Sequence, residues 1–219
     1  MQKEFWQQKW ESNQIGFNQD SPNALLIQYI GSLSLKSGDR VFVPLCGKSI
    51  DMLWLLSQGF EVVGVELSSI ACDAFFSENN IRVNAIRTGN FVVYRSKGIT
   101  IFCGDFFNLT KEILGKVDAV FDRAALIALP PDLQQRYVNF IISLLEPNTP
   151  VLLIAGTYNQ NEMSGPPFSI DEYRVKELYG EHFSIKLLCN RTAEEIPAHL
   201  KARGLTHASE QVYSLTLSA

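Results

Sequence analysis

The segment from Arg40 to Ser68 constrains the fold more than any other part of this chain. It begins with Arg40–Leu45, an apolar and β-branched run without polar alternation, which predicts a strand covered on both faces. A helix follows, because apolar residues recur at helical spacing until Gly59 ends the element. The run Glu61–Leu67 predicts a second strand. Strand, helix and strand in this order predict a parallel β-α-β unit with its helix packed on the sheet.

The loop of this unit restricts the kind of ligand that it could bind. Glu66 lies about 20 residues beyond the loop, where dinucleotide folds keep the acid that binds ribose hydroxyls. Those folds use G-x-G-x-x-G to approach a pyrophosphate, whereas Gly47 is the only glycine of this loop. The string CGKS is not a P-loop either, because that motif needs glycine where Phe42 stands. A ligand with a ribose but no phosphate fits best, and S-adenosylmethionine is the common one.

Strands and helices continue to alternate after Ser68. We expect helices at Ala71–Glu78, Asp132–Leu145 and Asp171–Leu178. Strands are expected in the hairpin-like FVVYRSKGITIFCGD, in Val117–Asp122, and in PVLLIAG, SIKLLC and QVYSLTL. This order predicts an α/β fold with a doubly wound, mostly parallel seven-stranded sheet, helices on both faces and one antiparallel strand late in the chain.

The composition is that of an ordinary globular protein, and we expect a single domain over 1–219. Hydrophobic residues make up 46% and charged residues 19%, with a formal net charge of −4. An acidic chain gives no reason to expect nucleic acid as a partner. The N-terminus has no apolar signal core, and no stretch has the roughly 18 apolar residues of a membrane-spanning helix. We therefore expect a cytoplasmic protein without a membrane partner.

Cysteines and histidines do not suggest a metal centre. The four cysteines lie far apart without a C-x-x-C pair, so they are interpreted as reduced, mostly buried thiols. His182, His199 and His207 have no metal-ligand spacing. We predict no metal site.

Polar and aromatic residues follow several of the predicted strands, where an open α/β sheet binds its ligand. Asp105 and Phe106 come after the third strand, where the carboxylate could accept from an adenine amine and the ring could cover the base. Asp105 could equally cap the following turn. Arg123 ends a later strand and could hold an anionic substrate or the cofactor carboxylate through paired hydrogen bonds. Asp122 and Arg123 could instead form a surface ion pair of little energy.

The N-terminal segment carries an aromatic stripe, with Phe5, Trp6 and Trp10 at helical spacing and Phe17 just beyond Gly16. Such a stripe is typical of a docking face. A helix before the first strand could also fold over the open end of the sheet as a lid. Its aromatic faces would suit a sulfonium cation, by about 1 kcal/mol or somewhat more when water is excluded.

With these features together, the chain resembles the thiopurine S-methyltransferase family, and its bacterial branch in particular. The motifs that carry the resemblance are spread over nearly the whole chain, and their joint order is highly specific. They are F-W-x-x-K-W at Phe5–Trp10 with Gly16 and Phe17, V-P-L-C-G-K-S at Val43–Ser49, G-V-E-L-S at Gly64–Ser68, F-D-R-A-A-L at Phe121–Leu126 and G-P-P-F at Gly165–Phe168.

The resemblance implies a class I methyltransferase, Rossmann-like fold, with an N-terminal helical cap (1–35) on a core (36–219). S-adenosylmethionine would be the methyl donor, leaving S-adenosylhomocysteine, and an aromatic or heterocyclic thiol such as a thiopurine the acceptor. The family's cofactor residues map onto Trp10, Leu45, Glu66, Asp105, Phe106 and Arg123. Arg123 would also touch the substrate and favour its thiolate, as the catalytic residue. The acceptor pocket would be lined by Phe17, Pro167 and Phe168, with a basic residue from His199, Lys201 or Arg203.

Three other functions remain open at this point. One is methylation of small oxygen, nitrogen or metalloid acceptors such as tellurite or selenite, in a detoxification role. Another is a non-catalytic nucleoside-binding module. The third, an NAD-linked oxidoreductase, is disfavoured by the missing glycines. No obligate interface is evident, and we expect a monomer.

Overall fold

A single nine-stranded sheet organises the fold. The computed structural model describes residues 3–193 and 195–218. The strands are β1 (Arg40–Val43), β2 (Glu61–Glu66), β3 (Asn84–Thr88), β4 (Phe91–Ser96), β5 (Ile99–Cys103), β6 (Ala119–Arg123), β7 (Pro150–Thr157), β8 (Phe183–Thr192) and β9 (Ser209–Leu217). Their order in the sheet is β3-β4-β5-β2-β1-β6-β7-β9-β8. The order reverses at β1, whose two neighbours are the later strands β2 and β6, so the carboxyl end of β1 is the expected ligand site.

The predicted α/β class is confirmed, but the predicted number of seven strands is wrong. Seven strands, β5-β2-β1-β6-β7-β9-β8, form a doubly wound arrangement in which β9 is the late antiparallel strand. β3 and β4 extend the sheet with an antiparallel hairpin beside β5. Every residue of β3 is exposed, so this strand lacks the apolar pattern by which a half-buried strand is found in a sequence.

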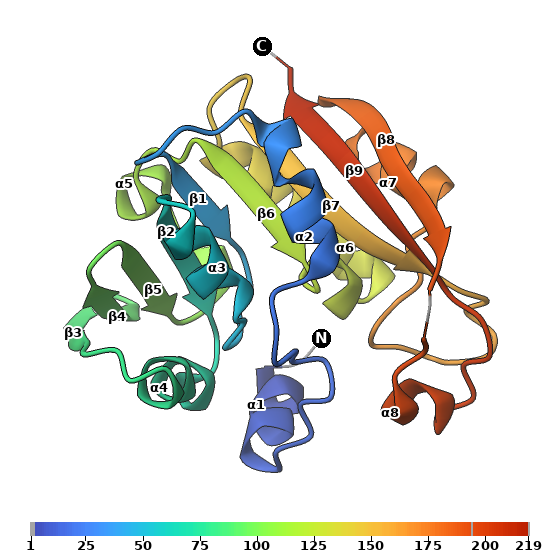
Figure 1. Cartoon of the computed structure of the whole chain (residues 1–219), viewed down its shortest axis with the longest axis horizontal. Helices are drawn as coiled ribbons and strands as arrows, with labels where there is room; N and C mark the ends of the chain where they lie inside the picture. The colour runs from blue at the N-terminus through green and yellow to red at the C-terminus, as the bar shows by residue number, and fades with distance from the viewer. Residues whose placement is uncertain (1–2, 194, 219) are drawn as a thin grey trace.

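Helices cover both faces of the sheet, as predicted. α2 (Ala24–Tyr29), α3 (Asp51–Ser57) and α4 (Ser69–Glu78) pack on one face, and α5 (Lys111–Leu114), α6 (Pro131–Leu144) and α7 (Glu172–Tyr179) on the other. In Figure 1, α2 and α3 lie in front of the central strands and α6 behind them. The sheet residues are buried on both sides, which explains the continuous apolar runs of the central strands.

β1 ends two residues earlier than the sequence indicated, because of the two residues that follow Val43. Pro44 cannot donate a backbone hydrogen bond to a neighbouring strand, and Leu45 has a left-handed backbone with φ +47°. The backbone therefore turns away from the sheet immediately after Val43, at the end of the strand where the order of the sheet reverses.

The N-terminal helix α1 (Lys3–Glu11) lies at the carboxyl end of the central strands. Figure 1 shows it on the side toward which the arrowheads of β1 and β6 point, with α8 (Ala198–Lys201) at the same end of the molecule. The Lys3 ammonium reaches Asp105 after β5, at 2.8 Å. The predicted helix is thus present over this end of the sheet, and its action as a lid remains a prediction.

Candidate functional site

The loop after β1 has an unusual backbone that is locked to the neighbouring strand. Leu45 and Gly47 both have positive φ, +47° and +53°. The N–H of Cys46 donates to the carbonyl of Val65 on β2 at 3.0 Å. A left-handed leucine costs free energy that the surrounding structure must supply, and such residues cluster at functional sites. The loop is therefore held in one conformation, directly beside the end of β2.

Glu66, at the end of β2, is the buried acid of this site. Its Oε2 accepts from the N–H of Gly47 at 2.8 Å, and its Oε1 accepts from the N–H of Ser68 at 2.7 Å. Burial raises the pKa of this carboxyl above its usual value, while the backbone N–H groups act in the opposite direction. Each carboxylate oxygen keeps lone-pair capacity beyond these bonds, so the group can still accept from two hydroxyls.

Trp10 covers the loop from the N-terminal side. A Cβ on Gly47 would lie 3.3 Å from Cζ2 of the indole, so the ring rests on the glycine backbone. The indole is buried, although α1 is otherwise mostly exposed. Phe17 packs edge-on against both Trp10 and Trp6, with ring centroids 5.6 and 5.5 Å apart. Trp10 therefore joins the aromatic stripe to the loop after β1, here called the motif loop, which donates to Glu66 through Gly47.

Arg123, at the end of β6, is paired with Asp51, a residue that sequence reasoning missed. Its Nε donates to Oδ2 of Asp51 at 2.6 Å, and its Nη2 donates to the hydroxyl of Ser49 at 3.2 Å. The side chains of Arg123 and Asp51 are only 13% and 1% exposed. The guanidinium is thus fixed next to the same loop that Trp10 covers.

The alternative of a surface pair between Asp122 and Arg123 is excluded, because Asp122 is buried and has other partners. Its Oδ2 accepts from the hydroxyl of Tyr137 at 2.7 Å, on the opposite face of the sheet from Asp51. Burial raises the pKa of Asp122 to about 6. Asp122 is therefore a core group, and only Arg123 faces the site.

Asp105 caps the turn that follows β5, as the simpler interpretation proposed. Its Oδ1 accepts from the N–H of Phe107 at 3.0 Å, and its Oδ2 pairs with Lys3. The ring of Phe106 packs in the core against Tyr137 and Phe140, with centroids 5.1 and 5.0 Å apart. The ring is therefore buried, and its expected role as the cover of an adenine remains a prediction.

The loop that contains Gly165–Phe168 is tied to the C-terminal segment by Arg203. Nη1 of Arg203 donates to the carbonyl of Pro166 at 2.5 Å, and Nη2 to that of Gly165 at 3.0 Å. Pro167 is held by the hydroxyl of Tyr158, which donates to its carbonyl at 2.5 Å. A small group of buried side chains joins the two segments, and we name it the loop cluster: Met163, Ile196 and Leu205, with Tyr158, Leu200 and Ala208 packed against them.

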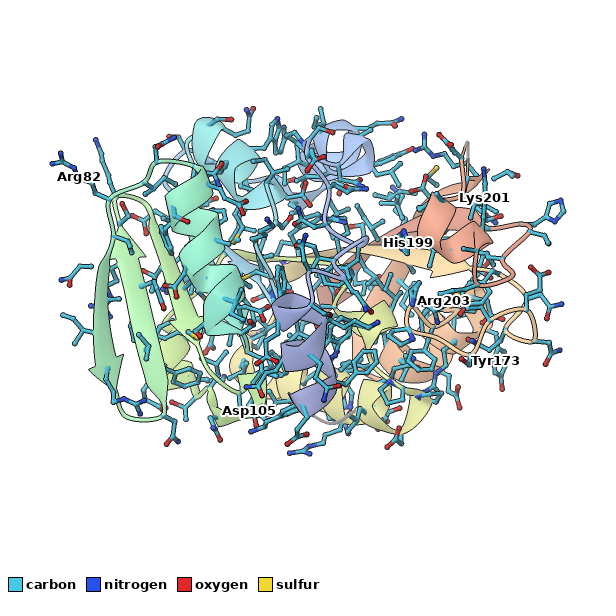
Figure 2. The ribbon with its side chains drawn as sticks, turned by 90° about the horizontal axis from the view of Figure 1, so that it is seen from below. Arg82, Asp105, Tyr173, His199, Lys201 and Arg203 are labelled. Carbon is cyan, nitrogen blue, oxygen red and sulfur yellow. The ribbon has the colours of Figure 1, made fainter. Side chains whose placement is uncertain are left out.

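His199 lies against the N-terminal segment, because a Cβ on Gly16 would be 2.7 Å from its Nδ1. Burial, with a smaller contribution from Arg203, lowers the pKa of this imidazole below its usual value. Lys201 is exposed. In Figure 2, α1 lies between Asp105 on one side and His199 and Arg203 on the other. His199 therefore lies beside Gly16, and Arg203 contacts Gly165 and Pro166, next to residues predicted to line the acceptor pocket; which basic residue faces the acceptor remains a prediction.

Within the described residues, no three His, Cys, Asp or Glu side chains are placed to hold a metal ion. None of the helices described there has the length and apolar character needed to cross a membrane.

The sequence profile described as Thiopurine S-methyltransferase (TPMT) matches residues 1–218. The chain belongs to this family. A thiopurine S-methyltransferase from Methylococcus capsulatus is 44% identical over 220 residues, which cover 100% of this chain and 99% of that protein. A relative of the same name from Nitrosospira multiformis is 42% identical over 215 residues, covering 98% of each chain. The predicted family is therefore confirmed, and with it the predicted class of enzyme and its methyl donor, S-adenosylmethionine.

Solved structures confirm the class I methyltransferase fold of this family member. One is the Burkholderia thailandensis 1,6-didemethyltoxoflavin-N1-methyltransferase with bound 1,6-didemethyltoxoflavin and S-adenosylhomocysteine. It matches with a TM-score of 0.63 and 16% identity over 99% of this chain and 87% of that chain. A SAM-dependent methyltransferase from Anabaena variabilis matches with the same TM-score and 12% identity, over 98% and 94% of the two chains.

Proposed function

We propose that this chain transfers the methyl group of S-adenosylmethionine to aromatic or heterocyclic thiols, thiopurines among them. The observation that carries the proposal is the buried Glu66 carboxylate, held by the N–H groups of Gly47 and Ser68, beside a loop that Trp10 contacts at Gly47 and Arg123 contacts at Ser49. The relatives that share the full length of the chain are named for thiopurine methylation, which supports this acceptor class.

The residues at this end of the sheet fit the nucleoside of the methyl donor. Glu66 would accept from the two ribose hydroxyls, since both of its oxygens retain lone-pair capacity. Trp10 and Leu45 would lie against the cofactor from the two sides of the motif loop. Asp105 and the backbone of Phe106 would meet the adenine at the end of β5. When bound, the cofactor supplies an electrophilic methyl group on a sulfonium.

The acceptor needs little acid–base catalysis from the protein. A thiol of this class ionises easily, and its thiolate sulfur forms the new S–C bond while the electron pair of the broken bond stays on the departing thioether sulfur. Alignment of the two reactants and exclusion of water can account for about 7 to 11 kcal/mol of the barrier. Arg123 would favour the thiolate through its charge, and Phe17, Pro167 and Phe168 would enclose the ring of the acceptor.

We propose one domain over 1–219, with an N-terminal helical cap (1–35) that closes over the site of the core (36–219). The protein would act as a cytoplasmic monomer on small molecules, without nucleic acid, in keeping with its net charge of −4.

A labelled-methyl transfer assay against a panel of aromatic thiols, small oxygen and nitrogen acceptors, tellurite and selenite tests the acceptor class. Methylated thiols are expected, with turnover that falls in Arg123→Ala. Transfer to tellurite or selenite alone would replace the proposed acceptor with a metalloid. Cofactor binding by calorimetry without any methylated product would favour a non-catalytic nucleoside-binding module.

A further inference from the structure

Asp51 is a fully buried carboxylate at the first position of α3, and both of its oxygens have partners from other parts of the chain. Its Oδ2 accepts from Nε of Arg123 at 2.6 Å. Its Oδ1 accepts from the N–H of Asn23 at 2.7 Å. The burial of a charged group is tolerated only when it is paired and hydrogen-bonded, and both conditions are met here.

The contact with Asn23 links this carboxylate to the N-terminal segment. Asn23 lies six positions after Phe17 in the sequence, and its own side chain caps α2 by accepting from the N–H of Leu25 at 3.0 Å. The segment between α1 and α2 is therefore fixed at one end by Asp51. Before this segment, at the end of α1, Trp10 lies against Gly47 of the motif loop, and Phe17 of the segment packs on Trp10.

The contact with Arg123 fixes the orientation of the guanidinium. Nε is occupied by Asp51, and Ser49 accepts from Nη2 at 3.2 Å. Among residues 3–193 and 195–218, Nη1 donates to no protein acceptor. Because the five N–H donors of a guanidinium lie in one rigid plane, fixing Nε also fixes the direction in which Nη1 can donate to a ligand.

We propose that Asp51 is a positioning residue for methyl transfer: one oxygen orients Arg123 toward the acceptor, and the other anchors the segment that carries Trp10 and Phe17. Asp51 would act through these two contacts and not on a reactant, since both of its oxygens have protein partners. This inference rests on the proposed function, because it requires that Arg123 acts on the acceptor. An asparagine could not replace Asp51, since its amide has a single acceptor oxygen and would turn N–H donors toward either Arg123 or Asn23.

The first experiment is a double-mutant cycle in kcat/KM for a thiol acceptor. Asp51→Asn should lower kcat/KM by about 100-fold in the wild-type background, as expected when a group at the reaction centre is misplaced. In the Arg123→Ala background, the same change should have an effect of only about 2-fold. Equal losses in both backgrounds would overturn the role of Asp51. If Arg123→Ala alone left turnover unchanged, the proposed function of Arg123 would fail instead.

Two further variants separate charge from position. Asp51→Glu keeps two acceptor oxygens and should recover part of the lost activity, whereas no recovery would contradict the proposal. Asp118→Asn is the matched control, because Asp118 immediately precedes β6 at the other end of the strand and accepts from the N–H of Arg40 at 2.9 Å. It should leave kcat/KM unchanged, and a loss as large as that of Asp51→Asn would show that the effect is one of stability.

NMR spectroscopy of the protein without ligands tests the contact between Asp51 and Arg123 independently of any activity assay. In ¹⁵N NMR spectra, the Nε–H of Arg123, assigned by its loss in Arg123→Ala, should exchange slowly with water and be strongly deshielded by its carboxylate partner. Both features should disappear in Asp51→Asn. A rapidly exchanging Nε–H in wild-type protein would overturn the proposal, even if the single Asp51 variant failed to fold.

Discussion

The indole of Trp10 rests on the backbone of Gly47, so a larger residue at this position of the loop after β1 would press against the ring. A Cβ at this position would lie 3.3 Å from Cζ2 of the ring, and the glycine has φ +53°. The N-terminal helix α1 and the loop after β1 therefore pack against each other at this contact. Two properties of glycine, its small size and its freedom to adopt positive φ, are both used at this point.

The Trp10–Gly47 contact predicts that Gly47→Ala lowers both stability and cofactor affinity. The left-handed backbone should cost about 1–2 kcal/mol in the free energy of unfolding, measured by urea denaturation. The added methyl should also displace Trp10 and weaken binding of S-adenosylhomocysteine in calorimetry. Gly89→Ala is the matched control, because Gly89 has φ +57° and open space around its Cβ position. It should lose stability and keep full affinity; equal affinity in both variants would contradict a role for the Trp10 contact.

Glu66→Gln should weaken binding of S-adenosylhomocysteine by about 10- to 100-fold, since hydrogen bonds to a charged group contribute about 1.5–3 kcal/mol. Glutamine has only one acceptor oxygen, so it cannot accept hydrogen bonds from Gly47, Ser68 and the ribose hydroxyls together. Calorimetry measures the affinity, and circular dichroism should show a preserved fold. Glu61→Gln, at the exposed other end of β2, should bind normally. Undiminished affinity in Glu66→Gln would rule out the ribose contact.

Arg203→Ala should raise the KM for the thiol acceptor several-fold and leave the affinity for S-adenosylhomocysteine unchanged. The reason is that Arg203 holds the carbonyls of Gly165 and Pro166, in the loop expected to enclose the acceptor. Steady-state kinetics and calorimetry separate the two effects. Lys201→Ala, which removes an exposed basic residue from the same segment, should change neither value. A parallel loss of cofactor affinity would show that Arg203 acts on the whole site.

The buried carboxyl of Asp122 should make the protein more stable as the pH falls from about 6 to about 4. Its pKa is about 6 in the folded protein against an ordinary value of 3.8, so the folded state holds an extra proton in this window. Stability due to this group is therefore complete below pH 4 and is lost as the pH rises through 6, by about 3 kcal/mol in total. Urea denaturation of wild-type protein and Asp122→Asn at several pH values measures the difference. The wild-type advantage should grow toward low pH; a constant difference would mean that Asp122 titrates normally.

The sequence predicted the central β-α-β unit and the position of Glu66 because buried parallel strands and the intervening helix have strong, regular patterns. Three structural features could not be predicted from the sequence, each for a local reason. β3 is wholly exposed and shows no such pattern. Asp51 reads as an ordinary acid in the first turn of a helix, and only the tertiary fold brings Arg123 from 72 positions away to pair with it. The ring of Phe106 turns into the core through contacts with α6 that no spacing in the sequence indicates.

The role of Arg203 was similarly hidden, since three basic residues of one short segment are equivalent in sequence. What distinguishes them is the direction of each side chain from α8, where Arg203 reaches the loop of Gly165 and His199 reaches Gly16. Such differences are set by packing in the loop cluster. The sequence did contain one signal, because a glycine followed by two prolines is typical of a turn. Gly165 indeed has a positive φ of +80°.

The loop cluster is structurally separate from the rest of the fold. Its buried side chains, Met163, Ile196 and Leu205, form a core separate from the two that sandwich the sheet. If these segments enclose the acceptor as proposed, 158–168 and 196–208 should be exchanged together, as one unit, between relatives that prefer different acceptors. The residues proposed to bind the methyl donor would remain unchanged in such an exchange.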